Sequence, residues 1–409
     1  MHPSISPNDP RNLDVAKYMD KIAEVSNGLA ELMPNVRCLN HDRASSNSIA
    51  KLLYGQLAGH YADQLQCLNS RYPIAVPLDR PFLKLRDTLI DHDLEEDYQV
   101  PRMASGELVT MTLANGATNH LWAPFSASSE SRVIEFTKLK TLCASYCTIY
   151  KANGAVVHHR DGHPWELHFP SLKSISVSSK RGTCPLLEYA VLPPRMESIS
   201  IELSSTAFCI TGDIELPETN SLSLTVLSHS FNGPSGLPVI NRILERARGC
   251  ESLELFYRER DLHVAPEEIT CTALTRLLIA SPAPVDTMLA LIEKLPRLTR
   301  LTFDKLLNEN IQRDISIPEA DEDAVVEPLS TSLKVLGINY NIYEHLPDIA
   351  VAVAKYLLLR IPTLTQLFAA QTPKDGVHGF VQSYSACYPR LGAVELKLYE
   401  GRGSANLRF

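Results

Sequence analysis

One short pattern recurs along much of the chain. It reads x-x-L-x-x-L-x-L, with aliphatic or aromatic residues exchanging at the L positions, as in TALTRLLI (272–279), PRLTRLTF (296–303) and TSLKVLGI (331–338). A strand with an inward L-x-L alternation cannot bury its apolar side chains alone. The copies must therefore stack, and the pattern predicts a parallel sheet that grows by one strand with each copy.

The copies follow one another at the period of a repeat array. The first apolar position of one copy lies, on average, about 28 residues after that of the previous copy, enough for one strand and one returning segment. The longest step contains the acidic segment 318–328, which we expect to be an exposed loop inserted between two copies. The first apolar positions are Leu108, Leu139, Leu172, Met196, Leu222, Cys250, Leu274, Leu298, Leu333, Leu364 and Leu391.

Several returning segments have the apolar periodicity of helices. In the segment 285–295, Val285, Met288, Leu289 and Ile292 fall on one helical face. Such a face would cover the side of the sheet on which the L residues lie. Helices are expected over 285–295, 237–249 and 346–361, and, nearer the N-terminus, over 13–33 and 45–68.

These motifs resemble the leucine-rich-repeat family, of the irregular type found in ribonuclease-inhibitor-like arrays and in the repeat region of F-box proteins. The family consensus places Asn or Cys three residues after the last L, as Cys147 and Asn341 do here. Leu306, Ser204 and Pro282 take that position in other copies. The regular backbone hydrogen bonding of the family is therefore not expected at those turns.

The resemblance implies an α/β solenoid with a curved parallel sheet on the concave side and with helices and irregular segments on the convex side. It is good over residues 131–399, which we expect to form the repeat array. Residues 1–12 are expected to be disordered and 400–409 to be a C-terminal tail. Residues 13–130 are expected to be a helical region with degenerate repeats that caps the array.

Composition limits the function. Lysine and arginine number 39 against 47 aspartate and glutamate residues, for a net charge of −8. Nucleic-acid binding, which relies on phosphate neutralisation, is therefore not expected. The chain shows neither a signal peptide nor an apolar run of membrane-spanning length, so no membrane association is expected. Nine scattered cysteines without a CxxC pair indicate reduced thiols in a cytoplasmic or nuclear protein.

A histidine-rich segment, 158–168, offers an alternative function. His159 and His163 are four residues apart, as two metal ligands on one helical face would be, with His158 beside them. Gly162 and Pro164 argue against a helix there, and neither a cysteine pair nor an H-E-x-x-H motif accompanies it. The segment is more simply a connection between two repeats, and the metal-dependent enzyme remains the alternative hypothesis.

The main hypothesis is a non-catalytic scaffold that binds a protein partner on the outward side of its strands. The family resemblance extends it to a substrate receptor for ubiquitin ligation, with a ligase adaptor as a second partner; a regulatory module that controls an enzyme is a further alternative. No cofactor, metal or catalytic residue is expected. Outward positions include Ser174, Ser176, Ser178, Thr302 and Glu395, and the candidate partner-binding residues are Glu254, Phe256, Arg276, Arg300, Asp304, Asn339, Lys397 and Tyr399.

Overall fold

The computed structural model shows an α/β protein built on a parallel sheet of 14 strands that is not closed. The chain divides into two compact units, one of Met1–Met196 with Cys209–Glu215 and the other of Glu197–Phe208 with Leu216–Phe409. The structure describes residues 10–41, 48–70, 82–91, 106–114, 133–145, 166–179, 187, 190–203, 216–226, 243–245, 247, 249–257, 269–307, 327–340, 347–369, 371–385 and 388–398.

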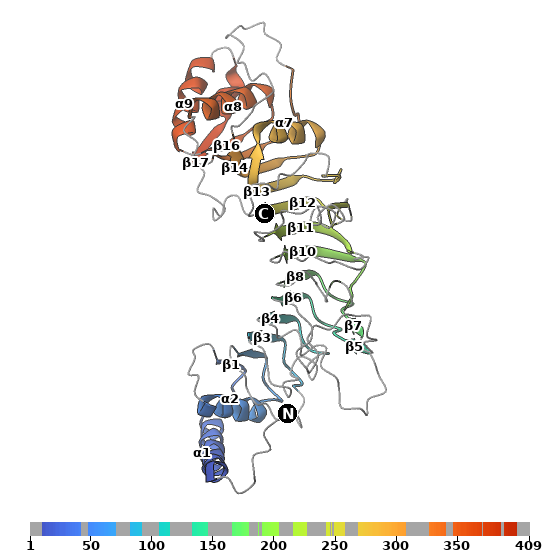
Figure 1. The fold of residues 1–409 in the computed structure, drawn as a ribbon, viewed down its shortest axis with the longest axis vertical. Coiled ribbons are helices and arrows are strands. Elements are labelled where there is room, and N and C mark those ends of the chain that lie inside the picture. Colours follow the sequence, from blue (N-terminus) through green and yellow to red (C-terminus); the bar gives the residue numbers. More distant parts are fainter. Residues whose placement is uncertain are drawn as a thin grey trace. The chain divides into compact units, whose positions relative to one another are not determined.

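The described part of the first unit includes helices α1 and α2 and six strands of the large sheet, in the order β1-β2-β3-β4-β6-β8 (Figure 1). A second sheet of three strands, in the order β5-β7-β9, belongs to the same unit. The elements are α1 (Pro10–Leu32), β1 (Cys38–His41), α2 (Ser48–His60), β2 (Cys67–Ser70), β3 (Asp87–Asp91), β4 (Thr110–Ala114), β5 (Val133–Glu135), β6 (Thr141–Ala144), β7 (Glu166–His168), β8 (Ser174–Ser179) and β9 (Ala190–Val191).

The described part of the second unit has its strands in chain order and includes helices α7, α8 and α9 and a 3₁₀ turn (Figure 1). Its elements are β10 (Arg195–Leu203), β11 (Glu218–Val226), β12 (Ser252–Tyr257), β13 (Arg276–Pro284), α7 (Val285–Lys294), β14 (Arg300–Leu307), β15 (Val335–Tyr340), α8 (Pro347–Arg360), β16 (Gln366–Ala369), α9 (Gln371–Tyr384), η3 (Pro389–Ala393) and β17 (Glu395–Leu398).

The L positions of the sequence pattern form the core. On β12, β13 and β14, Leu253, Leu277 and Leu301 are directly opposite one another and all have 0% exposure. Two residues further along, Leu255, Ile279 and Phe303 form a second buried row. Residues at these positions point to the same side of the sheet because side chains alternate along a strand. The expected strand with inward L-x-L residues is confirmed.

A tight turn precedes the strand in several copies. The amide of the first L residue donates to the carbonyl three residues earlier, as Leu298 does to Leu295 (3.1 Å) and Leu364 to Ile361 (3.2 Å). In another copy the hydroxyl oxygen of Ser330 takes the place of that carbonyl and accepts from the Leu333 amide. The repeat therefore has a fourth element, a residue at the start of the turn that is apolar in the copies of Leu295 and Ile361 and polar at Ser330, which the x-x-L-x-x-L-x-L pattern omits.

The returning segments differ between the units. In the second unit α7 packs on β13 and β14, and α9 packs on α8, β16 and β17 (Figure 1). Val285, Met288, Leu289 and Ile292 of α7 are buried, as the helical periodicity of 285–295 predicted. In the first unit the short strands β5 and β7 lie just before the turns, and Phe136 and Phe169, which follow them, stack with ring centroids 5.1 Å apart.

Some expected boundaries were wrong. The helix expected over 45–68 ends at His60, and Cys67 and Leu68 belong to β2. Helix α1 spans Pro10–Leu32, where a helix over 13–33 was expected. The strands β1 to β4 belong to the large sheet, so strand stacking extends through the region in which only degenerate copies were expected.

Two copies were placed in the wrong register. Leu222 pairs with Leu253, so it fills the second L position, and the buried Thr219 fills the first. Likewise Leu396 pairs with Leu367 and fills the second position of the last copy. The last copy is shifted by two residues, and side chains alternate along a strand, so Glu395 and Lys397 still lie on the outward side.

Candidate functional site

The outward side of the second unit includes two rows of side chains that run across neighbouring strands from β11 to β17. The first outward row begins each strand and is accessible along its length, whereas the second outward row, two residues further on, is buried over β13 to β16. From β11 to β17 the first outward row is Ser221, Ser252, Arg276, Arg300, Val335, Gln366 and Glu395, and the second is Ser223, Glu254, Leu278, Thr302, Gly337, Phe368 and Lys397.

The buried part of the second outward row corrects one expectation. Thr302 was expected to be accessible but is only 2% exposed, and Leu278 and Phe368 are 6% and 2% exposed. Phe368 packs against Val335, and the Lys397 ammonium lies 5.6 Å from the centre of its ring. Among the described side chains of β13 to β16, the first outward row is thus the accessible one, and the second is buried.

Lys397 and Glu395 are already engaged with each other. The Lys397 Nζ lies 2.9 Å from Glu395 Oε2, and the Gln366 side-chain amide donates to the same oxygen at 2.9 Å. The hydrogen bond from Lys397 holds the pKa of the Glu395 carboxyl below its ordinary value. Because Lys397 also lies over the Phe368 ring, its charge and its aliphatic stem are largely engaged in contacts within the protein.

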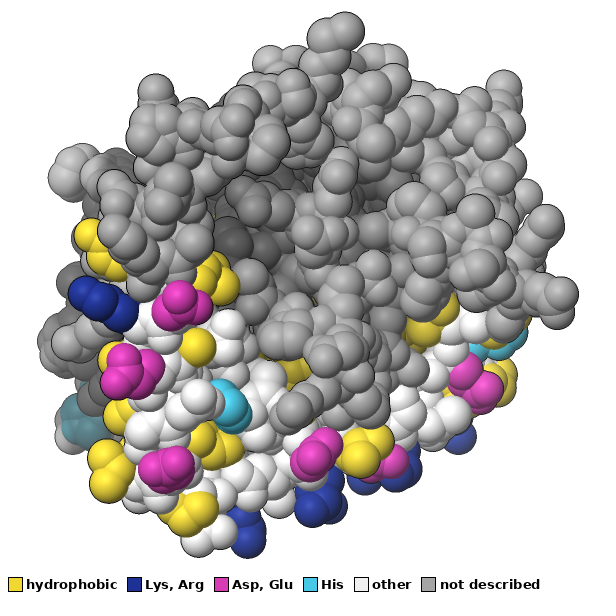
Figure 2. Space-filling model, turned by 90° about the horizontal axis from the view of Figure 1, so that it is seen from below, with side chains coloured by type: hydrophobic (Ala, Val, Ile, Leu, Met, Phe, Trp, Pro, Cys, Tyr) yellow, Lys and Arg dark blue, Asp and Glu magenta, His cyan; other side chains and the backbone are white. Residues whose placement is uncertain are grey.

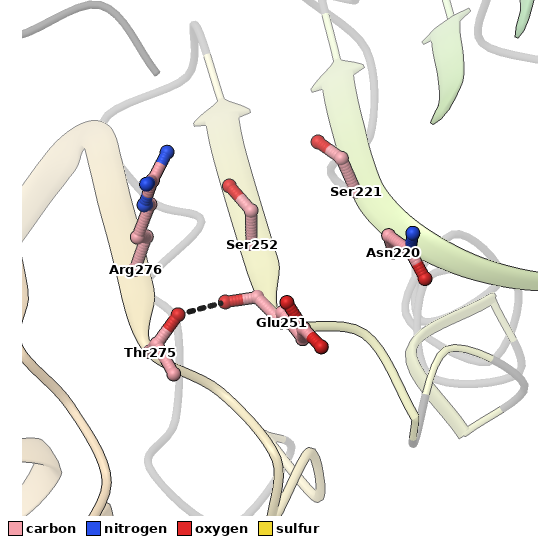
Figure 3. Close-up of a pocket in the computed structure, with 6 residues that line it drawn as sticks. All are labelled: Asn220, Ser221, Glu251, Ser252, Thr275 and Arg276. Atoms are coloured by element: carbon pink, nitrogen blue, oxygen red, sulfur yellow. Dashed lines mark hydrogen bonds between the residues drawn. The ribbon is translucent and has the colours of Figure 1, made fainter. Parts of the chain in front are cut away.

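A pocket of about 340 Å³ lies at the beginning of β11, β12 and β13. Figure 3 shows Arg276, Ser252 and Ser221 projecting in the same direction from three neighbouring strands. All are at least partly accessible, and two of them carry hydroxyl groups. The lining residues are Asn220, Ser221, Glu251, Ser252, Thr275 and Arg276.

Backbone hydrogen bonds between the turns hold the pocket in shape. The Glu251 amide donates to the Asn220 carbonyl (2.9 Å), and the Glu251 carbonyl accepts from the amides of Thr275 (2.8 Å) and Arg276 (3.0 Å). The Thr275 hydroxyl donates to the same carbonyl at 3.1 Å (Figure 3). The floor is therefore fixed before any ligand arrives, which lowers the entropic cost of binding.

Two arginines are adjacent at one side of this pocket. Arg276 and Arg300 are directly opposite each other on β13 and β14. Arg276 is exposed, and its guanidinium makes no hydrogen bond or ion pair within the described part of the chain. Burial, together with the neighbouring charge of Arg276, lowers the pKa of Arg300. Like charges opposite each other on neighbouring strands destabilise a sheet, so an anion bound there would be stabilising.

Seven of the eight candidate residues lie in strands of the second unit, and the side chains of five of them are described. Arg276 is exposed, and Glu254, Phe256, Arg300 and Lys397 are half-buried. The Glu254 carboxylate accepts a hydrogen bond from Ser223 at 3.4 Å. The structure brings Glu254 and the two arginines onto neighbouring strands and leaves Lys397 on a distant one. Three candidates are not described in this way: the side chains of Asp304, on β14, and Asn339, on β15, and the whole of Tyr399.

Most of the histidine-rich segment cannot be placed. His158, His159 and His163 lie outside the described residues, and the segment joins them only at β7, which ends at His168. Within the described ranges no group of three or more His, Cys, Asp or Glu side chains could hold a metal ion. Likewise, no helix in those ranges is long and apolar enough to cross a membrane.

Two buried cysteines have a structural explanation. The sulfur atoms of Cys250 and Cys271 are 3.5 Å apart, and Cys271 Sγ lies 3.1 Å from the Ala247 carbonyl, to which it donates. Cys250 fills the first L position of one copy, and Cys271 opens the turn of the next. The hydrogen bond with Cys271, together with burial, raises the pKa of the Cys250 thiol, so this thiol stays protonated and packs as an apolar group.

Sequence reasoning missed most of the pocket. Ser221, Ser252 and Thr275 are small polar residues without a distinguishing signal, and Glu251 and Asn220 look like ordinary turn residues. One signal was available, since every lining residue lies one or two positions before an L-x-L pair. Aligning those positions between neighbouring copies would have brought them together.

Comparison with known proteins gives no assignment. The chain matches no protein-family model, no curated protein and no solved structure. On the face shown in Figure 2, the described acidic, basic and hydrophobic side chains are interspersed, without a broad region of one kind among them.

Proposed function

We propose that this chain is a leucine-rich-repeat protein that binds a polypeptide partner through the outward side of its second unit, without catalysis. The observation that carries the proposal is the first outward row, an in-register line of accessible side chains from β11 to β17. Repeat proteins of this kind present extended sheet faces to their partners.

The chemistry of the row favours a polypeptide. Serines, two arginines, a valine, a glutamine and a glutamate follow one another across the strands, with Glu254 and Phe256 beside them. A polar surface of mixed charge with an accessible aromatic ring suits a protein interface. A nucleic-acid groove would require clustered positive charge, which does not fit a chain with a net charge of −8.

The proposal is tested by capture of partners on the full-length chain in three forms. The wild type is compared with a double variant of the face, Phe256→Ser with Arg276→Ser, and with the matched variant Arg297→Ser. Arg297 is an exposed arginine of the same unit that does not line the pocket. We expect specific partners to be recovered with the wild type and with Arg297→Ser and lost with the double variant.

Equal recovery by all three forms would contradict the proposal. The same experiment tests the narrower hypothesis of a substrate receptor. Recovery of a cullin-type ligase adaptor, together with partners that depend on the face, would support that role, and consistent absence of any adaptor would leave a scaffold without it.

A further inference from the structure

We propose that the pocket at Arg276 binds the carboxylate of an aspartate or glutamate side chain of the partner. This inference rests on the proposed function, since it assigns one position of the polypeptide that the outward face binds. Arg276 would hold the two carboxylate oxygens through its guanidinium, and the hydroxyls of Ser252 and Ser221 would supply further donors.

The arrangement of donors carries the proposal. Arg276 stands exposed at the rim of a preformed pocket, beside two hydroxyls that project the same way from neighbouring strands (Figure 3). Its guanidinium offers five N–H donors in a planar fork that matches a carboxylate, and no described side chain takes them. Arg300, directly opposite on β14, adds a second positive charge.

The acidic residues nearby limit the charge of the ligand. Glu251 lines the same pocket without forming an ion pair with Arg276 within the described residues, and Glu254 lies two strand positions beyond Ser252. A ligand with a single negative charge gains from the arginines and is repelled little by these carboxylates. A doubly charged phosphate would be both attracted and repelled more strongly, so comparing phosphoserine with glutamate is what distinguishes the two ligands.

The floor of the pocket makes the contact selective. The carbonyl of Glu251 is already occupied by the amides of Thr275 and Arg276 and by the Thr275 hydroxyl. The donors that remain accessible, on Arg276, Ser252 and Ser221, therefore suit an acceptor. A neutral amide of the same shape would match them less well, because it offers one acceptor oxygen where a carboxylate offers two and has no charge to pair with the guanidinium.

The test uses peptides as probes for the full-length chain. Random 12-residue peptides are selected by display on the wild-type protein, and the tightest ones are synthesised with each acidic residue either kept or replaced by its amide. Dissociation constants are measured by fluorescence anisotropy against the wild type, Arg276→Gln, Arg276→Lys and the control Arg297→Gln. Circular dichroism melts check that each variant is folded, as expected for exposed positions.

We expect one acidic position whose amide replacement weakens binding to the wild type about 10-fold to 100-fold, the range of a charge-assisted hydrogen bond. Arg276→Gln should lose the same factor and no longer distinguish acid from amide. Arg276→Lys should fall between, since lysine keeps the charge but not the fork, and Arg297→Gln should match the wild type.

The outcomes separate the two proposals. Peptides that bind the face, as shown by loss of binding to Phe256→Ser, but that carry no acidic position would overturn the carboxylate site and leave the proposed function intact. Tighter binding of a selected peptide synthesised with phosphoserine in place of the acidic residue at that position would also overturn it. A selection that returns no peptide dependent on any residue of the face would count against both.

Discussion

The burial of Leu278 is the structural finding on which the size of the outward face depends. Of three consecutive residues of β13, Arg276 is exposed, whereas Leu277 and Leu278 are both buried, with 0% and 6% exposure. Strand alternation places Leu278 on the outward side with Arg276. If that side were open there, truncating Leu278 would cost no more than an ordinary surface substitution.

The structure gives the expected magnitudes. Leu→Ala removes three carbon atoms, worth about 0.8 kcal/mol each when they are buried, so Leu278→Ala should lower the free energy of unfolding by about 2 kcal/mol. Leu277→Ala also leaves a cavity between the leucines of β12 and β14 and should cost about 3 to 4 kcal/mol. Arg276→Ala should stay within about 0.5 kcal/mol of the wild type.

Guanidinium denaturation followed by circular dichroism measures the order of the three variants. Hydrogen exchange of peptides from β13 then shows whether the loss is local to that strand. If Leu278→Ala were as stable as Arg276→Ala, the reasoning would be refuted: the second outward row would be open at β13, and the face available to a partner would be larger than proposed.

Three further predictions concern charges and thiols. Arg276→Gln should raise the free energy of unfolding by less than about 1 kcal/mol, and the unfolding midpoint with it, because it removes repulsion with Arg300. The gain should shrink in high salt, and a lower midpoint would contradict this prediction. Burial raises the pKa of Cys67 from 9.0 to about 11, so iodoacetamide should label the exposed Cys38 before Cys67, and equal labelling rates would contradict this prediction. The contribution of Cys67 to stability should be complete below pH 9 and should be lost between pH 9 and 11. The Glu395 carboxyl has a lowered pKa because Lys397 donates to it, so the contribution of Glu395 to stability should be lost as the pH falls below the ordinary pKa of 4.5. Glu395→Gln should flatten that part of the dependence of stability on pH, measured by urea denaturation.

The strands were predictable because the L-x-L alternation is a direct consequence of burial on one side. Register was less so. Around Leu222, apolar residues follow at Leu224 and Val226 as well as at Leu227, and only the turn before the strand, with the buried Thr219, decides which position is first. Sequence spacing alone carries no information on that turn.

The candidate site was predictable only in part, for a different reason. Arg276, Arg300 and Glu254 were found because charged residues in an alternating strand must point away from the core. The burial of Thr302 and Phe368 could not be found in this way, since it depends on what covers the outward side. The pocket was missed because it is formed by residues of three copies that are far apart in the sequence.

Because a tight turn precedes the strand in several copies, the spacing of the outward side chains does not depend on the number of residues in a repeat. Opposite residues on neighbouring strands are 20 residues apart between Leu68 and Thr88 but 35 apart between Leu301 and Leu336. Strand spacing is nevertheless about 4.8 Å in any sheet. Residues can thus be gained or lost in a returning segment without moving the side chains that a partner meets. A partner therefore meets one side chain of the first outward row per copy, at a constant spacing. Changing a single residue of that row alters the contact at one copy alone.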